Sequence, residues 1–252
     1  MLLCLLTTLV TCQDPAPAPA QPPAAPAAPA APPAQVVETW DDKTAKAAAA
    51  ELTKSMKAAA SMVEKNRALE KVAAGSNTML LKPLGDIVEQ EKSVVIRKRA
   101  VQLIGNQPAG PANTALRKLL KNSSVQAHPA VVAELVRNLA RCGYETKQWP
   151  EIADLFEKGY EQERVPLHEA VLDLITVHKE KQAIELLLRN LDHPEPADVH
   201  AGDNPPQEYW EARWKAWSAW KGKVKDALFA ITGQRFSTAT EARAWLKQNP
   251  LR

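Results

Sequence analysis

The segment 193–204 holds the side chains best suited to metal chemistry. His193, Glu195, Asp198 and His200 are all of metal-ligating types and lie close together in the chain. Zinc sites, however, need ligands fixed on rigid elements with a defined spacing, and this proline-containing segment matches no metal motif. We therefore favour solvation and helix capping for these four residues, keep them as the metal candidates, and expect neither a metal nor a cofactor.

A second candidate site is a row of tryptophans. Trp210, Trp214, Trp217 and Trp220 fall within a stripe about 120° wide on an expected helix. Such a stripe suits stacking on sugars or anchoring a partner, or else it packs on the helix around 187–191. Packing is favoured because Val224, Leu228 and Ile231 continue the stripe. Tyr209 and Trp220, at its edges, are the residues expected to be exposed and to contact a partner.

Catalytic chemistry has little support elsewhere in the chain. His128, His168 and His178 are scattered and have no nucleophile or acid partner at a motif spacing. Cys142 is the only cysteine outside the first 12 residues, and we expect it to be a small core residue. The residues therefore predict a protein that is not an enzyme.

The elements that must position these groups repeat every 36 residues. Each repeat carries two helical apolar stripes, which is typical of an α-solenoid. The matched positions are Leu80, Leu116 and Ile152; Leu84, Leu120 and Phe156; Ala100, Val136 and Leu172; and Leu103, Leu139 and Ile175. A single helix pair cannot bury its stripe, so neighbouring pairs must stack and share one core.

Helix starts and stops support these pairs. Capping side chains and first-turn prolines mark starts, and a left-handed glycine marks a stop. The expected starts are Ser93, Asn113, Pro129, Pro150 and Pro166, and the expected stops are Gly105 and Gly143.

The run from Val95 to Gly105 resembles the second helix of a HEAT repeat. In that family a Val-Arg pair is followed by Ala and then by Leu-x-Gly, and Ile96-Arg97, Ala100 and Leu103-Ile104-Gly105 take those places. The resemblance covers roughly residues 76–192. It implies an all-α fold, a right-handed α-solenoid of stacked antiparallel helix pairs.

Flanking segments are expected to cap this stack. In residues 37–75 the pattern predicts a helical segment that starts at Asp41 or Asp42 and is interrupted near 60–64. After the loop 193–204, residues 205–252 predict a Trp-rich pair of helices. The expected signals in this last segment are Asn204, Pro205 and Gln207 at the first start, Gly233 at its stop, and a capping box from Thr238 to Glu241. The Thr232–Phe236 turn resembles the C-terminal segment of exported bacterial HEAT-repeat proteins.

The N-terminal segment predicts export. Residues 1–12 form an apolar run that is too short to span a bilayer and fits a secretory signal. Leu9-Val10-Thr11-Cys12 resembles a bacterial lipobox, which makes Cys12 a candidate for lipidation; the alternative is ordinary cleavage and release. Residues 13–36 form a Pro/Ala-rich linker, and 15–35 contain only Pro, Ala and Gln, a composition typical of an extended, disordered tether.

These observations predict a non-enzymatic interaction scaffold in the periplasm or cell envelope. We expect it to bind a protein or peptide through the concave face of the second helices, near Arg97, Arg99, Glu134 and Arg137. The alternative is a glycan or cell-wall binding module that uses the Trp-rich helix. Export and a net charge of +3 argue against nucleic acid, and membrane contact is expected only through a lipid anchor.

Overall fold

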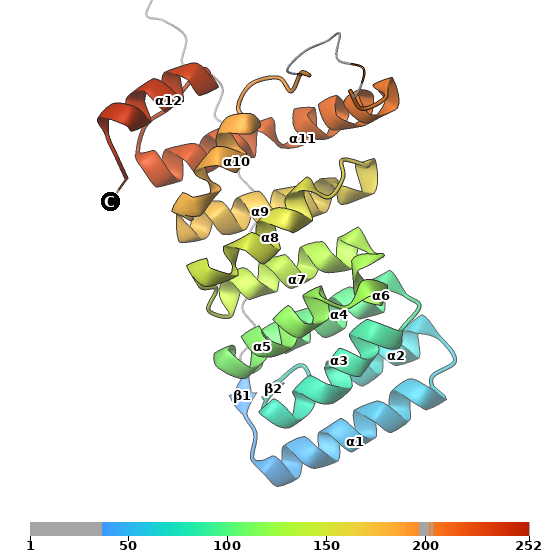
Figure 1. Ribbon diagram of the computed structural model, residues 1–252. Coiled ribbons are helices and arrows are strands. Elements are labelled where there is room, and N and C mark those ends of the chain that lie inside the picture. Colours follow the sequence, from blue (N-terminus) through green and yellow to red (C-terminus); the bar gives the residue numbers. More distant parts are fainter. Residues whose placement is uncertain (1–36, 197–201, 203, 252) are drawn as a thin grey trace, which may run out of the picture. The chain divides into compact units, whose positions relative to one another are not determined.

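A computed structural model describes residues 37–196, 202 and 204–251 (Figure 1). The expected signal, the Pro/Ala-rich linker and Cys12 lie outside the described residues, as do the metal candidates Asp198 and His200.

The described chain is mostly helical, which confirms the all-α prediction. The α-helices are α1 (Asp42–Ala58), α2 (Met62–Glu70), α3 (Leu81–Gln90), α4 (Val94–Gly105), α5 (Ala109–Leu120), α6 (Ser123–Gln126), α7 (Pro129–Arg141), α8 (Trp149–Glu157), α9 (Val165–His178), α10 (Ile184–Arg189), α11 (Gln207–Thr232) and α12 (Ala239–Gln248). Short 3₁₀ turns precede several of them: η1 (Thr78–Leu80), η2 (Thr146–Gln148), η3 (Gln162–Arg164) and η4 (Lys181–Ala183).

One small parallel pairing was not anticipated. Strand β1 (Glu38–Thr39) pairs with β2 (Gly75–Ser76), with Glu38 opposite Gly75. Trp40, just after β1, lies so close to Gly75 that a Cβ there would stand 2.3 Å from the indole. The residue at 75 must therefore be glycine for the indole to pack on the backbone.

The second helix of each helix pair, which is α4, α7 or α9, packs against the second helix of the next pair. Helix α4 packs against α7, α7 against α9, and α9 against α11, while α3, α5 and α8 pack against their own second helices α4, α7 and α9 (Figure 1). Helices α1 and α2 pair with each other at the N-terminal side, and α12 contacts α10 at the C-terminal side.

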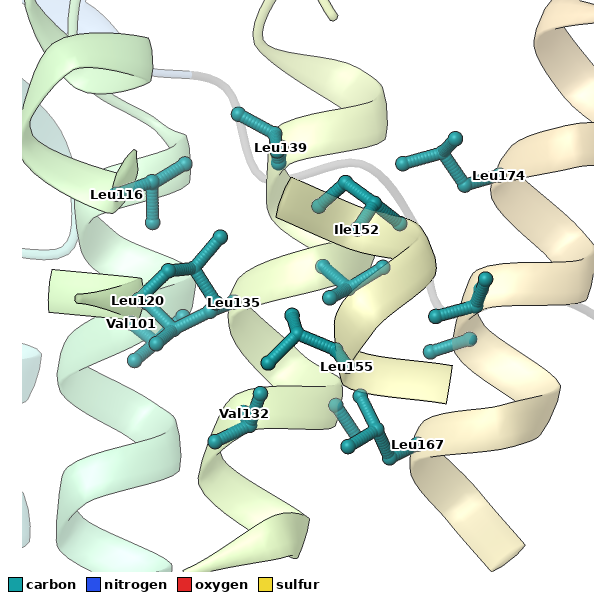
Figure 2. Close-up of a cluster of buried hydrophobic side chains, with 14 of the residues drawn as sticks. Val101, Leu116, Leu120, Val132, Leu135, Leu139, Ile152, Leu155, Leu167 and Leu174 are labelled. Atoms are coloured by element: carbon teal, nitrogen blue, oxygen red, sulfur yellow. The ribbon is translucent and has the colours of Figure 1, made fainter. Parts of the chain in front are cut away.

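The positions that repeat every 36 residues all face the interior. All of them, from Leu80 to Ile175, are buried. Figure 2 shows part of the shared core, in which Leu116 and Leu120 of α5 meet side chains of α7, and Ile152 and Leu155 of α8 approach α9. The burial of these stripes, as predicted for a shared core, is confirmed. Burying a Val, Leu, Ile or Phe side chain stabilises the fold by about 1.5–3 kcal/mol.

Most of the predicted helix ends are confirmed. Asp41, Ser93 and Thr238 each accept a hydrogen bond from a backbone N–H in the first turn of α1, α4 and α12, which satisfies donors that a helix start leaves unpaired. Pro129, Pro150 and Pro166 lie in the first turns of α7, α8 and α9. Gly143 and Gly233 have φ angles of 84° and 72°, so both are left-handed stops.

Three predicted helix ends are wrong. Asn113 lies inside α5, which begins at Ala109, and its side-chain amide donates to the Gly143 carbonyl at 2.9 Å. Helix α11 begins at Gln207 after Pro206, so Asn204 is not its N-cap. Gly105 is the last residue of α4, followed by Asn106 in the right-handed region, and it is not a left-handed stop.

Gly105 serves packing instead of chain reversal. A Cβ at this position would lie 2.1 Å from the side-chain oxygen of Asn138 on α7. Asn138 is buried, and its amide nitrogen donates to the carbonyl and the carboxylate of Glu134 at 2.9 and 3.1 Å, so it has little freedom to move. Cys142 donates its S–H to the Gly105 carbonyl at 3.3 Å, which confirms it as a small buried residue.

We predict that Gly105→Ala lowers the free energy of unfolding by about 1–3 kcal/mol, because the added methyl overpacks α4 against α7. The matched control is Gly85→Ala inside α3, where an added Cβ meets nothing within 4 Å among the described residues; it should raise stability by about 0.5–1 kcal/mol through helix propensity. Urea unfolding followed by circular dichroism measures both. Equal effects of the two substitutions would contradict this packing role.

Polar side chains also join one repeat to the next. Gln148 donates to Asn113 at 3.1 Å, and Tyr144 donates to the Glu180 carboxylate at 2.8 Å. The sequence separations of these bonds, 35 and 36 residues, match the repeat. The contacts therefore link neighbouring helix pairs at positions about one repeat apart.

Candidate functional site

Arg97 is not available to a partner. Its side chain is buried, with Nε donating to the Val88 carbonyl at 2.6 Å and a terminal nitrogen donating to the Ser124 carbonyl at 3.2 Å. Val88 lies near the end of α3, where carbonyls lack helical partners. The expectation that Arg97 lies on a binding face is therefore wrong, because the buried guanidinium bonds to a buried carbonyl of α3 and a partly buried one of α6.

We predict that Arg97→Met lowers the free energy of unfolding by about 2 kcal/mol, since it removes the partner of the buried Val88 carbonyl. Arg99, two residues later, is half-exposed and its nearest polar contact is Gln102 at 3.3 Å. Arg99→Met is the matched control and should change stability by less than about 0.5 kcal/mol. Urea midpoints of both variants test this, and a larger loss for Arg99→Met would refute the assignment.

Glu134 is also buried, which contradicts its predicted place on an open face. Its carboxylate accepts from Asn138 and lies 3.6 Å from a terminal nitrogen of Arg137. Arg137 is half-exposed and donates to the Pro166 carbonyl on α9 at 3.2 Å. Of the four charged candidates on α4 and α7, only Arg99 and Arg137 therefore present charge to solvent.

An apolar surface on α2 and α4 replaces the predicted charged one. Met62, Val63 and Val95 are 51, 67 and 63 % exposed. They line an open hollow of about 320 Å³ together with Arg67 and Glu70 of α2. We call these five residues the α2–α4 surface. This surface was not among the predicted sites, since Met62 and Val63 lie in the segment 37–75 that was expected only to cap the stack.

Trp220 lies in the core and not at an exposed edge. It is 0 % exposed, and its indole meets Phe156 and His168 at centroid distances of 5.3 and 5.8 Å. The expectation that Trp220 contacts a partner is wrong, because α11 turns this edge of the stripe onto α8 and α9. Tyr209 is half-buried and packs edge-on against Tyr160 at 5.8 Å, so its ring is only partly available.

The other tryptophans are half-buried. Trp214 and Trp217 donate their indole N–H groups to the carbonyls of Pro194 and Asn190 at 2.7 and 2.9 Å. These bonds hold the segment before α11 against the helix. The favoured prediction, packing on the helix around 187–191, fits Trp217, which bonds to Asn190. Trp220 is a core residue as that prediction requires, but its ring contacts are on α8 and α9. Trp210 and Trp214 also line an open hollow beside Pro205.

His168 is a buried histidine that the repeat pattern did not single out. Its Nε2 lies 3.1 and 3.0 Å from the carbonyls of Phe156 and Gly159; since carbonyls only accept, the proton is on Nε2. Burial, aided by the Arg164 charge, lowers the pKa of His168 from 6.5 to about 4. Its Nδ1 and the Trp220 indole nitrogen are both buried without a hydrogen-bond partner among the described residues.

The described metal candidates form only a pair. His193 Nδ1 lies 3.5 Å from a carboxylate oxygen of Glu195, and both side chains are exposed. Within residues 37–196, 202 and 204–251, no group of three or more metal-ligating side chains gathers in one place.

Comparisons with protein-family models, with curated proteins and with solved structures return no match for this chain. Among the described helices, none combines the length and the apolar character needed to cross a bilayer. The chemistry and exposure of the surfaces described above are therefore the grounds for a function.

Proposed function

We propose that this protein is a non-enzymatic interaction scaffold of the HEAT-repeat type, a right-handed α-solenoid that binds a protein or peptide. The 36-residue repeat, the burial of its matched positions and the order in which α4, α7, α9 and α11 contact one another support this architecture. Stacked helix pairs offer an extended surface on which side chains from successive repeats act together.

The exposure of apolar side chains on the α2–α4 surface is the main observation that supports the proposal. Met62, Val63 and Val95 each leave more than half of their area in water, which costs free energy that a partner would recover. Clustered exposed apolar residues with a polar rim are typical of interaction sites. Arg67 and Glu70 line the same hollow and supply that rim.

We further propose that the protein acts outside the cytoplasm. The apolar run 1–12 and the Pro/Ala-rich segment 13–36 support a secretory signal followed by a tether. At about 3.1 Å per residue, the Pro/Ala/Gln tract 15–35 would reach roughly 65 Å. If Cys12 is lipidated, the scaffold is held at a membrane surface. If the signal segment is cleaved and Cys12 is not lipidated, the scaffold is released.

The test compares three versions of the full chain as baits in chemical cross-linking from cell-envelope extracts. They are the native protein, the double variant Val63→Asp/Val95→Asp, and the control Val177→Asp, which alters a 69 % exposed valine on α9. We expect the native protein and the control to capture the same partner in similar amounts. The double variant should capture at least tenfold less of that partner.

Thermal unfolding must first show that both variants retain the native stability, as substitutions of exposed side chains should. The same capture by all three baits would refute the α2–α4 surface as the binding site. Failure of the native bait to enrich any protein above a tag-only control would refute the scaffold itself.

A further inference from the structure

A second open site lies at the start of α11. Its hollow measures about 550 Å³, and its walls include Trp210, Trp214, Pro196 and Pro205 on the apolar side, with Glu195 and Gln207 on the polar side. Sites for small molecules are typically concave, rich in aromatic surface and fitted with a few polar groups. It is separate from the α2–α4 surface, because α7 and α9 intervene between α4 and α11.

The two indoles are held in place by contacts outside this hollow. His193 stacks on Trp214 with centroids 5.5 Å apart, and the Trp214 N–H is bonded to the Pro194 carbonyl. Trp210 is met edge-on by Tyr209 at 5.4 Å, and the Arg213 guanidinium lies 5.5 Å from its ring. Rings fixed in this way lose little conformational entropy when a ligand stacks on them.

The hydrogen-bonding groups of the walls are of mixed type. Trp210 is half-buried, and its indole N–H can only donate. The Glu195 carboxylate is exposed and can only accept. The Gln207 amide nitrogen donates one hydrogen bond to the Glu211 carboxylate at 2.7 Å, and the amide still has a second N–H to donate and an oxygen that accepts. A complementary ligand must therefore offer donors and acceptors around a flat apolar face.

This combination disfavours several ligand classes relative to a neutral one. A proline-rich peptide also stacks on tryptophan, but its proline units have no N–H for Glu195. A cation bound over Trp210 would meet the repulsion of Arg213, and an anion would meet that of Glu195. A sugar ring is neutral, has an apolar C–H face, and carries hydroxyl groups that both donate and accept.

We propose that the hollow at the start of α11 is a carbohydrate-binding site, in which a sugar ring stacks on Trp210 and its hydroxyl groups bond to Glu195 and Gln207. This inference does not depend on the scaffold proposal, since it uses other residues and another class of ligand. In an envelope protein, it would let one chain contact a polysaccharide and a protein at the same time.

Affinity electrophoresis of the full chain in gels containing glycol chitin, hydroxyethyl cellulose or laminarin tests the proposal. We expect at least one of these neutral polysaccharides to retard the native protein. Trp210→Ala should weaken that retardation at least tenfold. The matched control is Phe229→Ala, which removes a partly exposed ring from the same helix outside the hollow, and it should bind like the native protein.

Circular dichroism of Trp210→Ala separates loss of the site from loss of the fold, and Glu195→Ala, in an exposed position, supplies a second variant that should weaken binding. Absence of retardation by all three polysaccharides would overturn the proposal. Equal retardation of Trp210→Ala and the native protein would overturn it too, as would calorimetric binding of a proline decamer in place of the sugars.

Discussion

Replacing Trp220 by alanine is expected to lower the free energy of unfolding by about 3–5 kcal/mol. Trp220 is the largest fully buried side chain of the described core, and it joins α11 to Phe156 of α8 and His168 of α9. Its removal leaves a cavity that rigid neighbouring helices cannot fill. Urea unfolding monitored by circular dichroism at 222 nm measures the loss without depending on tryptophan emission.

Two comparisons make this prediction specific. Phe229→Ala truncates a ring on the outer side of the same helix, 41 % exposed, and should cost less than about 1 kcal/mol. Trp220→Phe keeps most of the buried ring and removes an indole N–H that has no partner in the described structure, so its cost should be well below that of alanine. If Trp220→Ala cost no more than Phe229→Ala, the placement of α11 against α9 would be wrong.

The second large effect is a loss of stability in mild acid. The pKa of His168 is lowered from 6.5 to about 4 by burial and by the Arg164 charge. Between pH 6.5 and pH 4, His168 is protonated in the unfolded chain but neutral in the folded chain. The free energy of unfolding therefore falls as the pH drops below 6.5. The contribution lost is about 2 kcal/mol by pH 5 and about 3 kcal/mol by pH 4, since one pKa unit corresponds to 1.36 kcal/mol.

The variant His168→Gln isolates this contribution. A glutamine amide can still donate to the carbonyls of Phe156 and Gly159, but it does not titrate. We expect the native protein and the variant to differ in the slope of unfolding free energy between pH 7 and 5, with the variant much flatter. Parallel slopes would show that other groups cause the acid loss. Below pH 5, carboxylates with lowered pKa values, such as Glu151, add to it in both proteins.

The positions lining the core were predictable from the sequence because helical periodicity requires only local information. Leu84, Leu120 and Phe156 are buried as the repeat indicates. The caps Ser93 and Thr238 were predictable for the same reason, since a cap bonds backbone groups within its own first turn.

The site residues were predicted less well because their roles depend on other segments. Arg97 matches the HEAT pattern, yet its side chain satisfies carbonyls contributed by α3 and α6. Gly105 resembles a helix stop, yet it makes room for Asn138 of α7. Neither contact has a local signature, so charge and glycine content alone pointed to the wrong roles.

By itself, the sequence determined the helical class of this protein, the period of its apolar stripes and most of its helix ends, because these follow from backbone sterics and from the spacing of side chains along one helix. Only the tertiary structure decided that Trp220 is core while Trp210 faces a hollow, and that Val63 and Val95 are exposed while Glu134 is not. A helix has one stripe facing its neighbours, and which residues at the margins of that stripe are covered depends on the angle and offset at which the next helix packs.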